Sequence, residues 1–106
     1  MYKLVRKSEA IFRKIADNKF ATNYITKDIS PNVSLATLEG KDYQEETITE
    51  YNRIYYVLNG ELVLAFDSEK ISLEEGDTCF ISKDTKYGIS GTFKAIVINQ
   101  PAFGTQ

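Results

Sequence analysis

The side chains that most often perform chemistry in proteins are scarce in this sequence. None of the 106 residues is histidine, and Cys79 is the single cysteine. A nucleophilic cysteine needs a neighbouring base, and histidine is the most common one. Because Thr78, Phe80 and Ile81 are typical of a strand, we expect a buried thiol that packs as a small hydrophobe. A lone cysteine cannot form an internal disulfide, which indicates a reducing, cytoplasmic setting.

Arginine, tyrosine and threonine remain as groups that could bind a ligand. The chain has seven tyrosines and six phenylalanines, and aromatic side chains often line small-molecule pockets. The segment 53–58 (Arg-Ile-Tyr-Tyr-Val-Leu) is the strongest strand signal, and alternation places Arg53, Tyr55 and Val57 on one face. The other face is also apolar or aromatic, so the strand must be covered twice. One cover is an interior, and the other is a second sheet, the N-terminal segment or a partner subunit.

Length and composition limit the classes of protein to consider. We expect one domain over 1–106, with a core of its own. The net charge is -2 and basic residues are spread along the chain, so no nucleic-acid surface is expected. No apolar run approaches the roughly 20 residues that cross a bilayer, so no membrane contact is expected. The alternating start, residues 1–13, is unlike a secretory signal peptide.

A short helix is expected near the N-terminus. Ser8 can cap a helix over residues 9–16, in which Ile11, Phe12 and Ile15 share one face. A helix of this length needs tertiary packing to persist.

The remainder reads as short strands separated by turn residues. Asn59-Gly60 predicts a two-residue hairpin turn, because both positions tolerate positive φ. Nine or more strands at this spacing indicate an antiparallel sandwich or barrel, and parallel folds are excluded because long crossovers are missing. The expected strands are 20–25, 33–38, 46–50, 53–58, 61–66, 70–73, 78–81, 87–90 and 93–99.

Residues 45–91 resemble the two signature motifs of the cupin family. Gly60 matches the last glycine of the first motif, about 40–60, and Gly76 matches the first glycine of the second, about 76–91. The resemblance implies an all-β fold, the cupin double-stranded β-helix or jelly-roll barrel of RmlC-like proteins, here with a short N-terminal helix. Residues 51–62 and 99–103 also resemble the ethanolamine-utilisation protein Q cupins, a family poor in metal-binding histidines.

The cupin frame places Thr47, Thr49, Arg53 and Tyr87 where the family normally holds metal ligands. First-row metals prefer imidazole and carboxylate ligands. A guanidinium has a fixed positive charge and no lone pair to offer. We therefore expect neither a bound metal nor another cofactor.

An inward-pointing Arg53 needs an anionic partner, since an isolated buried charge is very costly. In one interpretation it pairs with an internal carboxylate, and the candidates are Glu46, Glu50 and Asp84. In the other it binds a ligand carboxylate or phosphate, with hydrogen bonds from Thr47, Thr49 and Tyr87.

The tyrosines and the charged runs can be assigned in the same frame. Tyr55 and Tyr87 are expected to face the pocket, and Tyr43 and Tyr51 to lie at its mouth; packing in the core or an interface is the alternative for each. The charged runs are expected to be solvated, as loop residues at Glu45-Glu46 and Glu74-Glu75 and as an exposed turn at Lys83, Asp84 and Lys86.

Three functions follow. The first is a metal-free cupin that binds a small, anionic metabolite of unknown identity in the barrel, through Arg53, Thr47, Thr49, Tyr55 and Tyr87. The second is a metal-independent acid–base enzyme of the isomerase, epimerase or lyase type, with Tyr87 as the candidate catalytic acid and a carboxylate of raised pKa, Glu46 or Glu50, as base. The third is a structural or regulatory module with a filled barrel. A homodimer is expected, since cupins commonly pair along strands.

Overall fold

The computed structural model describes residues 1–105, and nearly all of its regular structure is β-strand. The all-β prediction is therefore confirmed. The elements in chain order are one turn of 3-10 helix, η1 (Lys7–Glu9), and the strands β1 (Ile11–Ala16), β2 (Lys19–Ile25), β3 (Ser34–Ile48), β4 (Asn52–Phe66), β5 (Glu69–Leu73), β6 (Thr78–Ile81) and β7 (Lys86–Gln100).

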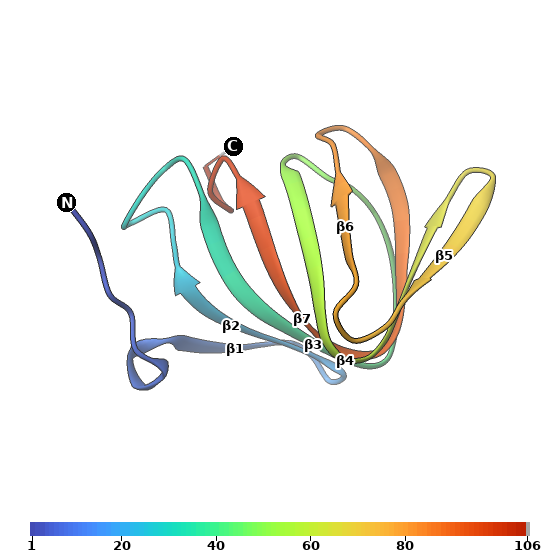
Figure 1. Ribbon diagram of the computed structural model, residues 1–106, viewed down its shortest axis with the longest axis horizontal. Coiled ribbons are helices and arrows are strands. Elements are labelled where there is room, and N and C mark those ends of the chain that lie inside the picture. Colours follow the sequence, from blue (N-terminus) through green and yellow to red (C-terminus); the bar gives the residue numbers. More distant parts are fainter. Residues whose placement is uncertain (106) are drawn as a thin grey trace.

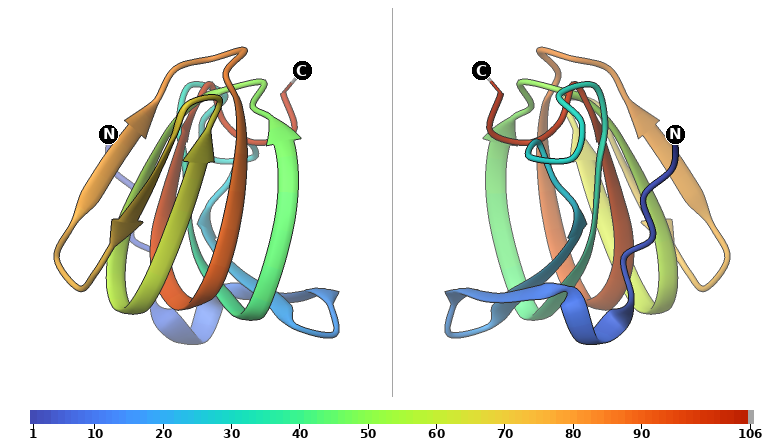
Figure 2. Two further views of the ribbon diagram at one scale, coloured as in Figure 1. Left: turned by 90° about the vertical axis from the view of Figure 1, so that its right-hand side faces the viewer. Right: turned by 90° about the vertical axis from the view of Figure 1, so that its left-hand side faces the viewer.

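The seven strands form one antiparallel sheet that curls around its own interior. The order of neighbouring strands is β1-β2-β3-β7-β4-β5, and β6 pairs with the first half of β4. Figure 1 shows the long strands β3, β4 and β7 curving from one side of the molecule to the other, and Figure 2 shows the same strands from both ends. The two halves of each long strand thus face each other as opposite walls of a jelly-roll barrel.

The bend in β4 replaces the hairpin that the sequence predicts at Asn59-Gly60, so that prediction is wrong. The chain continues along β7, and the register shifts between Val57 and Asn59. Gly60 has φ 80°, and a Cβ there would clash with the main-chain oxygen of Thr92. Glycine therefore permits a sharp bend in a continuous strand rather than a chain reversal.

Strand β7 likewise joins two predicted strands, 87–90 and 93–99, into one. Gly91 lies at the junction with φ 119°, where a Cβ would clash with the main-chain oxygen of Glu61. The register of β3 against β7 shifts nearby, between Gly40 and Tyr43. The irregularity in β3 and the bend in β7 therefore lie next to each other in the sheet.

The helix predicted over residues 9–16 is wrong, because η1 is a single 3-10 turn and β1 follows it. Strand β1 pairs with β2, and the rings of Phe12 and Phe20 stack at 5.8 Å. Pairing with β2 provides hydrogen-bond partners for main-chain N–H and C=O groups of β1. A short isolated helix, by contrast, is not stable in water. The three apolar residues that suggested a helix face, Ile11, Phe12 and Ile15, remain exposed.

The core lies between the two walls and takes residues from every strand from β2 to β7. Val57, Leu62, Leu64 and Ala95 have no exposed surface. The predicted alternation in β4 is confirmed on its inner face by Tyr55 and Val57, whereas its outer face is open to solvent. No helix in the described part of the chain is long and apolar enough to cross a bilayer.

Candidate functional site

A cavity of about 560 Å³ lies inside the barrel, between the walls formed by β2, β3, β4 and β7. Its size is within the range typical of small-molecule sites. Four basic side chains and two carboxylates line it, an excess of two positive charges at neutral pH. The charged lining residues are Arg13, Lys19, Lys27, Arg53, Asp28 and Glu45.

Arg53 is half-buried and its side chain lines the cavity, as the sequence predicts for the inner face of β4. Its Nε donates to Oδ1 of Asn99 at 2.7 Å, and its Nη1 donates to Oη of Tyr87 at 2.8 Å. Asn99 is directly opposite Arg53 in the β4–β7 pairing. Both acceptors are neutral, and the two bonds use two of the five N–H donors of a guanidinium.

Within residues 1–105, no ion pair joins Arg53 to Glu46 or Asp84, two of the three carboxylates that the sequence left open. Glu46, Glu50 and Asp84 are exposed, and the hydrogen bonds of Arg53 go instead to Asn99 and Tyr87. A partly buried guanidinium with neutral partners keeps its charge, which is then available to a group inside the cavity.

Tyr55 and Tyr87 form a hydrogen-bonded pair behind Arg53. Their hydroxyl oxygens are 2.7 Å apart, and each residue is only 2% exposed. Tyr55 lines the cavity as expected, whereas Tyr87 is not among the lining residues and holds the guanidinium from the opposite wall. Burial, with a contribution from Tyr87, raises the pKa of Tyr55 well above its ordinary value. Tyr55 is therefore a neutral phenol at physiological pH and can donate a hydrogen bond.

The two slot threonines have different surroundings. Thr47, on β3, lines the cavity. Thr49 is buried, and its Oγ1 donates to the main-chain oxygen of Tyr51 at 2.8 Å and accepts from the Tyr51 amide at 3.1 Å. Thr49 is not among the lining residues, so its hydroxyl closes the turn between β3 and β4.

Glu45 and Lys19 are lining residues that sequence reasoning did not identify. Lys19 Nζ donates to Oε1 of Glu45 at 3.0 Å and to Oη of Tyr43 at 3.1 Å. The interpretation of Glu45-Glu46 as loop residues is wrong, because both lie on β3. The available signal was its place two residues before Thr47, which puts both on one face of a strand.

The charges around this pair shift two pKa values in opposite directions. Burial opposes ionisation of Glu45, but hydrogen bonds from Lys19 and Tyr43 and the positive charges of Lys19 and Arg53 hold its pKa below the ordinary value. Burial and the Glu45 carboxylate raise the pKa of Tyr43. The pair is therefore a carboxylate beside an ammonium and a neutral phenol. Tyr43 itself is buried and is not among the lining residues.

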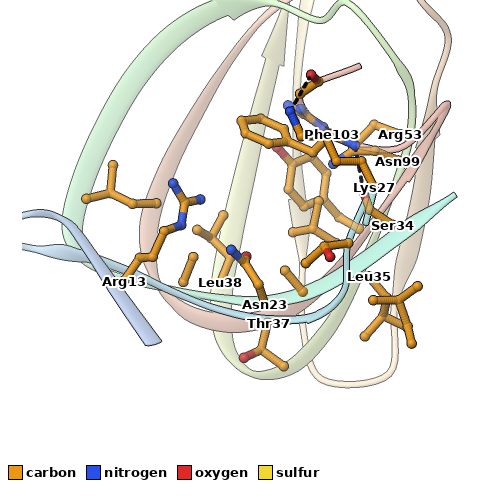
Figure 3. Close-up of a pocket in the computed structure, with 18 of the residues that line it drawn as sticks. Arg13, Asn23, Lys27, Ser34, Leu35, Thr37, Leu38, Arg53, Asn99 and Phe103 are labelled. Carbon is orange, nitrogen blue, oxygen red and sulfur yellow. Dashed lines mark hydrogen bonds between the residues drawn. The ribbon is translucent and has the colours of Figure 1, made fainter. Parts of the chain in front are cut away.

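The C-terminal segment forms part of the cavity lining, which the sequence did not indicate. The amide of Phe103 donates to Oγ of Ser34 at 2.9 Å, and Lys27 Nζ donates to the main-chain oxygen of Gly104 at 3.3 Å. Figure 3 shows Phe103, Lys27 and Ser34 near Arg53 and Asn99. This end of the cavity therefore carries two of its cations.

Aromatic rings connect this end of the cavity to Arg13. The Tyr51 ring is 5.5 Å from the Phe103 ring, and Cζ of Arg53 is 5.8 Å from the Tyr51 centroid. Cζ of Arg13, on β1, is 5.9 Å from the Phe103 centroid. Contacts of this kind favour a fixed position for both guanidinium groups.

The residues at the cupin metal position do not suit a transition metal. A guanidinium occupies one slot, hydroxyl groups occupy the other three, and none of these is a favoured ligand for such an ion. Within residues 1–105, no group of three or more histidine, cysteine, aspartate or glutamate side chains is arranged to hold a metal.

Cys79, on β6, is half-buried and lies outside the cavity lining. Its Sγ is 3.7 Å from the main-chain oxygen of Phe80, and burial raises the pKa of the thiol. A raised pKa lowers the thiolate fraction and so lowers reactivity.

Comparisons with known proteins agree with this architecture. Residues 6–103 match the family described as ethanolamine utilisation protein EutQ. The chain belongs to this family. It is 26% identical over 89 residues to a Clostridioides difficile protein named acetate kinase EutQ, and the match covers 82% of this chain but only 57% of that relative.

Two solved structures show the same fold. An RmlC-like cupin from Shewanella frigidimarina matches with a TM-score of 0.84 and 15% identity, over 98% of this chain and 95% of the other. The Streptomyces nucleoside dehydratase Pac13 matches with a TM-score of 0.79 and 18% identity, over 98% and 86%. The predicted cupin fold and the resemblance to ethanolamine-utilisation protein Q are confirmed.

Proposed function

We propose that this EutQ-family cupin binds a small organic anion in its barrel without a metal, with Arg53 as the anchoring group. The observation that carries the proposal is the guanidinium on the cavity wall, hydrogen-bonded to the neutral Asn99 and Tyr87. A carboxylate or phosphate is the natural partner for its remaining N–H donors, because such pairs are charge-assisted and can be bidentate.

The surroundings of Arg53 favour an anion over a neutral ligand. The positive excess in the lining raises the local concentration of anions. Asn99 and Tyr87 fix the guanidinium before a ligand arrives, which lowers the entropy lost on binding. Thr47 and Tyr55 add hydroxyl groups within the same cavity.

Calorimetric titration at low ionic strength tests the proposal. Acetate, suggested by the name of the Clostridioides relative, and inorganic phosphate are the first probes. We expect binding that weakens as salt is added and that falls by about tenfold or more in Arg53→Gln. Arg6→Gln is the matched control, because Arg6 is exposed and outside the cavity lining. Equal affinities in the wild type and Arg53→Gln contradict the proposal.

Acid–base catalysis is a second candidate, favoured by the hydrogen-bonded series Tyr55, Tyr87 and Arg53. A proton leaving Oη of Tyr55 for a ligand can be replaced from Tyr87, which leaves the negative charge beside the guanidinium. Pac13, of the same fold, is a dehydratase. The lining carboxylate Glu45 is a weak base because its pKa is lowered, and this favours binding over turnover.

The enzyme hypothesis predicts that the wild type turns over hydroxylated acids or nucleosides. It also predicts that Tyr55→Phe loses this turnover but still binds the substrate. Absence of turnover leaves binding as the function.

The third candidate, a filled barrel, is disfavoured by the cavity itself. We further propose one cupin domain that works as a homodimer in a reducing, cytoplasmic compartment, with no nucleic-acid or membrane partner.

A further inference from the structure

The cavity presents a hydrogen-bond donor site and a hydrogen-bond acceptor site within the same space. Arg53 and Glu45 both line it, one from β4 and the other from β3. The charge of Arg53 contributes to the lowered pKa of Glu45, which supports their proximity. A ligand anchored on Arg53 therefore also meets a carboxylate.

Glu45 keeps capacity to accept hydrogen bonds from a ligand. Lys19 Nζ donates to Oε1 and the Tyr43 hydroxyl also bonds to the carboxylate, whereas a carboxylate offers about four lone-pair sites in all. Thr47, two residues along β3, adds a hydroxyl to the same lining. The β3 wall is therefore suited to a ligand group that donates hydrogen bonds.

Two observations decide what kind of donor fits. An ammonium group is disfavoured because Lys19 already occupies one oxygen of Glu45 and the lining has an excess of positive charge. A hydroxyl group donates without adding charge. The cavity volume, about 560 Å³, leaves room for a molecule considerably larger than acetate.

We propose that the ligand is a hydroxylated organic anion, such as a hydroxy acid, a sugar acid or a sugar phosphate. Its anionic group lies on Arg53, and its hydroxyl groups donate to Glu45 and Thr47. This inference rests on the proposed anion-binding function and specifies the ligand class of the same site.

Matched pairs of anions that differ only in hydroxyl groups test the inference on the full chain. Gluconate is compared with hexanoate, and glycerol 3-phosphate with propyl phosphate, by calorimetry at one ionic strength. We expect the hydroxylated member of at least one pair to bind about tenfold tighter or more, the effect of a hydrogen bond to a charged group. Ethanolamine, a hydroxylated cation, should not bind measurably.

The variant Glu45→Ala locates the effect. We expect the ratio of affinities within a pair to fall toward one, because the carboxylate acceptor is gone. Glu46→Ala is the matched control, since Glu46 is adjacent, exposed and outside the lining, and it should keep the wild-type ratio. Melting temperatures check that both variants are folded. The comparison of paired anions on the wild type does not depend on either variant.

The outcomes separate this inference from the function on which it rests. Equal binding of both members of each pair, weakened by Arg53→Gln, overturns the hydroxylated ligand and keeps the anion site. A preference for hydroxyl groups that survives Glu45→Ala overturns the assignment to Glu45. Failure of every anion to bind overturns both proposals together.

Discussion

Nη1 of Arg53 is 2.8 Å from the hydroxyl oxygen of Tyr87, although 34 residues separate them. Arg53 lies near the start of β4, and Tyr87 near the start of β7. The two strands are paired antiparallel, so these residues come from distant parts of the ladder. Their contact closes the space between the two walls and fixes the guanidinium at the cavity. Together with the hydrogen bond from Nε to Asn99, this contact fixes the position of the charge in the candidate anion site.

Tyr87→Phe is expected to weaken both the fold and the site. The change removes the acceptor of Arg53 Nη1 and the partner of the Tyr55 hydroxyl. Leaving such buried groups unpaired costs about 1–3 kcal/mol, so the free energy of unfolding should fall by about that amount in urea denaturation. Tyr2→Phe, at a position that is 90% exposed, should change it by less than about 0.5 kcal/mol. A stable Tyr87→Phe variant would show that the pair does not support the fold.

Thr47 and Thr49 should respond differently to replacement by alanine. Thr49→Ala loses both hydrogen bonds to Tyr51, so we expect a loss of about 1–2 kcal/mol in unfolding free energy and little change in anion affinity. Thr47→Ala should leave the unfolding free energy nearly unchanged and weaken the binding of a hydroxylated anion. Denaturation and calorimetry on both variants make the comparison, and identical effects in the two would contradict the assigned roles.

Glu45 should add a small acid-sensitive component to stability. Its pKa is lowered from 4.5 in the folded chain, so folding favours the ionised form. The contribution is present above about pH 4.5 and is lost as the pH falls through the folded-state pKa. The ion pair with Lys19 is partly exposed, so we expect less than about 1 kcal/mol. Glu45→Gln should flatten the decline in melting temperature between pH 6 and 3, and an unchanged slope would count against the ion pair.

Short strands and turns could be read from the sequence, whereas the continuity of the long strands could not. Residues 78–81 and the turn before 70–73 lie as expected. Gly60 and Gly91 permit either a chain reversal or a bend. The choice is made by pairing with distant strands, which local residue chemistry does not encode. For the same reason the spacing of the three apolar residues of β1 suggests a helix, whereas pairing with β2 makes the segment a strand.

The sequence predicts some of the lining residues that lie inside the cupin motifs, but none of those that lie outside them. Of the four positions that the motif frame predicts, Thr47 and Arg53 line the cavity, whereas Thr49 and Tyr87 do not. Tyr55 lines it because alternation along β4 places it on the same face as Arg53. Lys19, Lys27 and Phe103 come from segments outside the motifs. They reach the cavity through sheet pairing and through the hydrogen bonds of the C-terminal segment. No spacing in the sequence relates these segments to Arg53.

The outer face of β4 gives the final prediction, a dimer formed through this surface. Ile54 and Tyr56 are 36% and 42% exposed, and Phe80, opposite Ile54 on β6, is 62% exposed. Exposed apolar clusters on a sheet favour association. We expect sedimentation analysis to show a dimer, and Phe80→Ser to raise its dissociation constant by about tenfold or more. Phe12→Ser, on the edge strand β1, is the control. If it separates the subunits and Phe80→Ser does not, the interface lies along β1, and a monomeric wild type overturns the dimer itself.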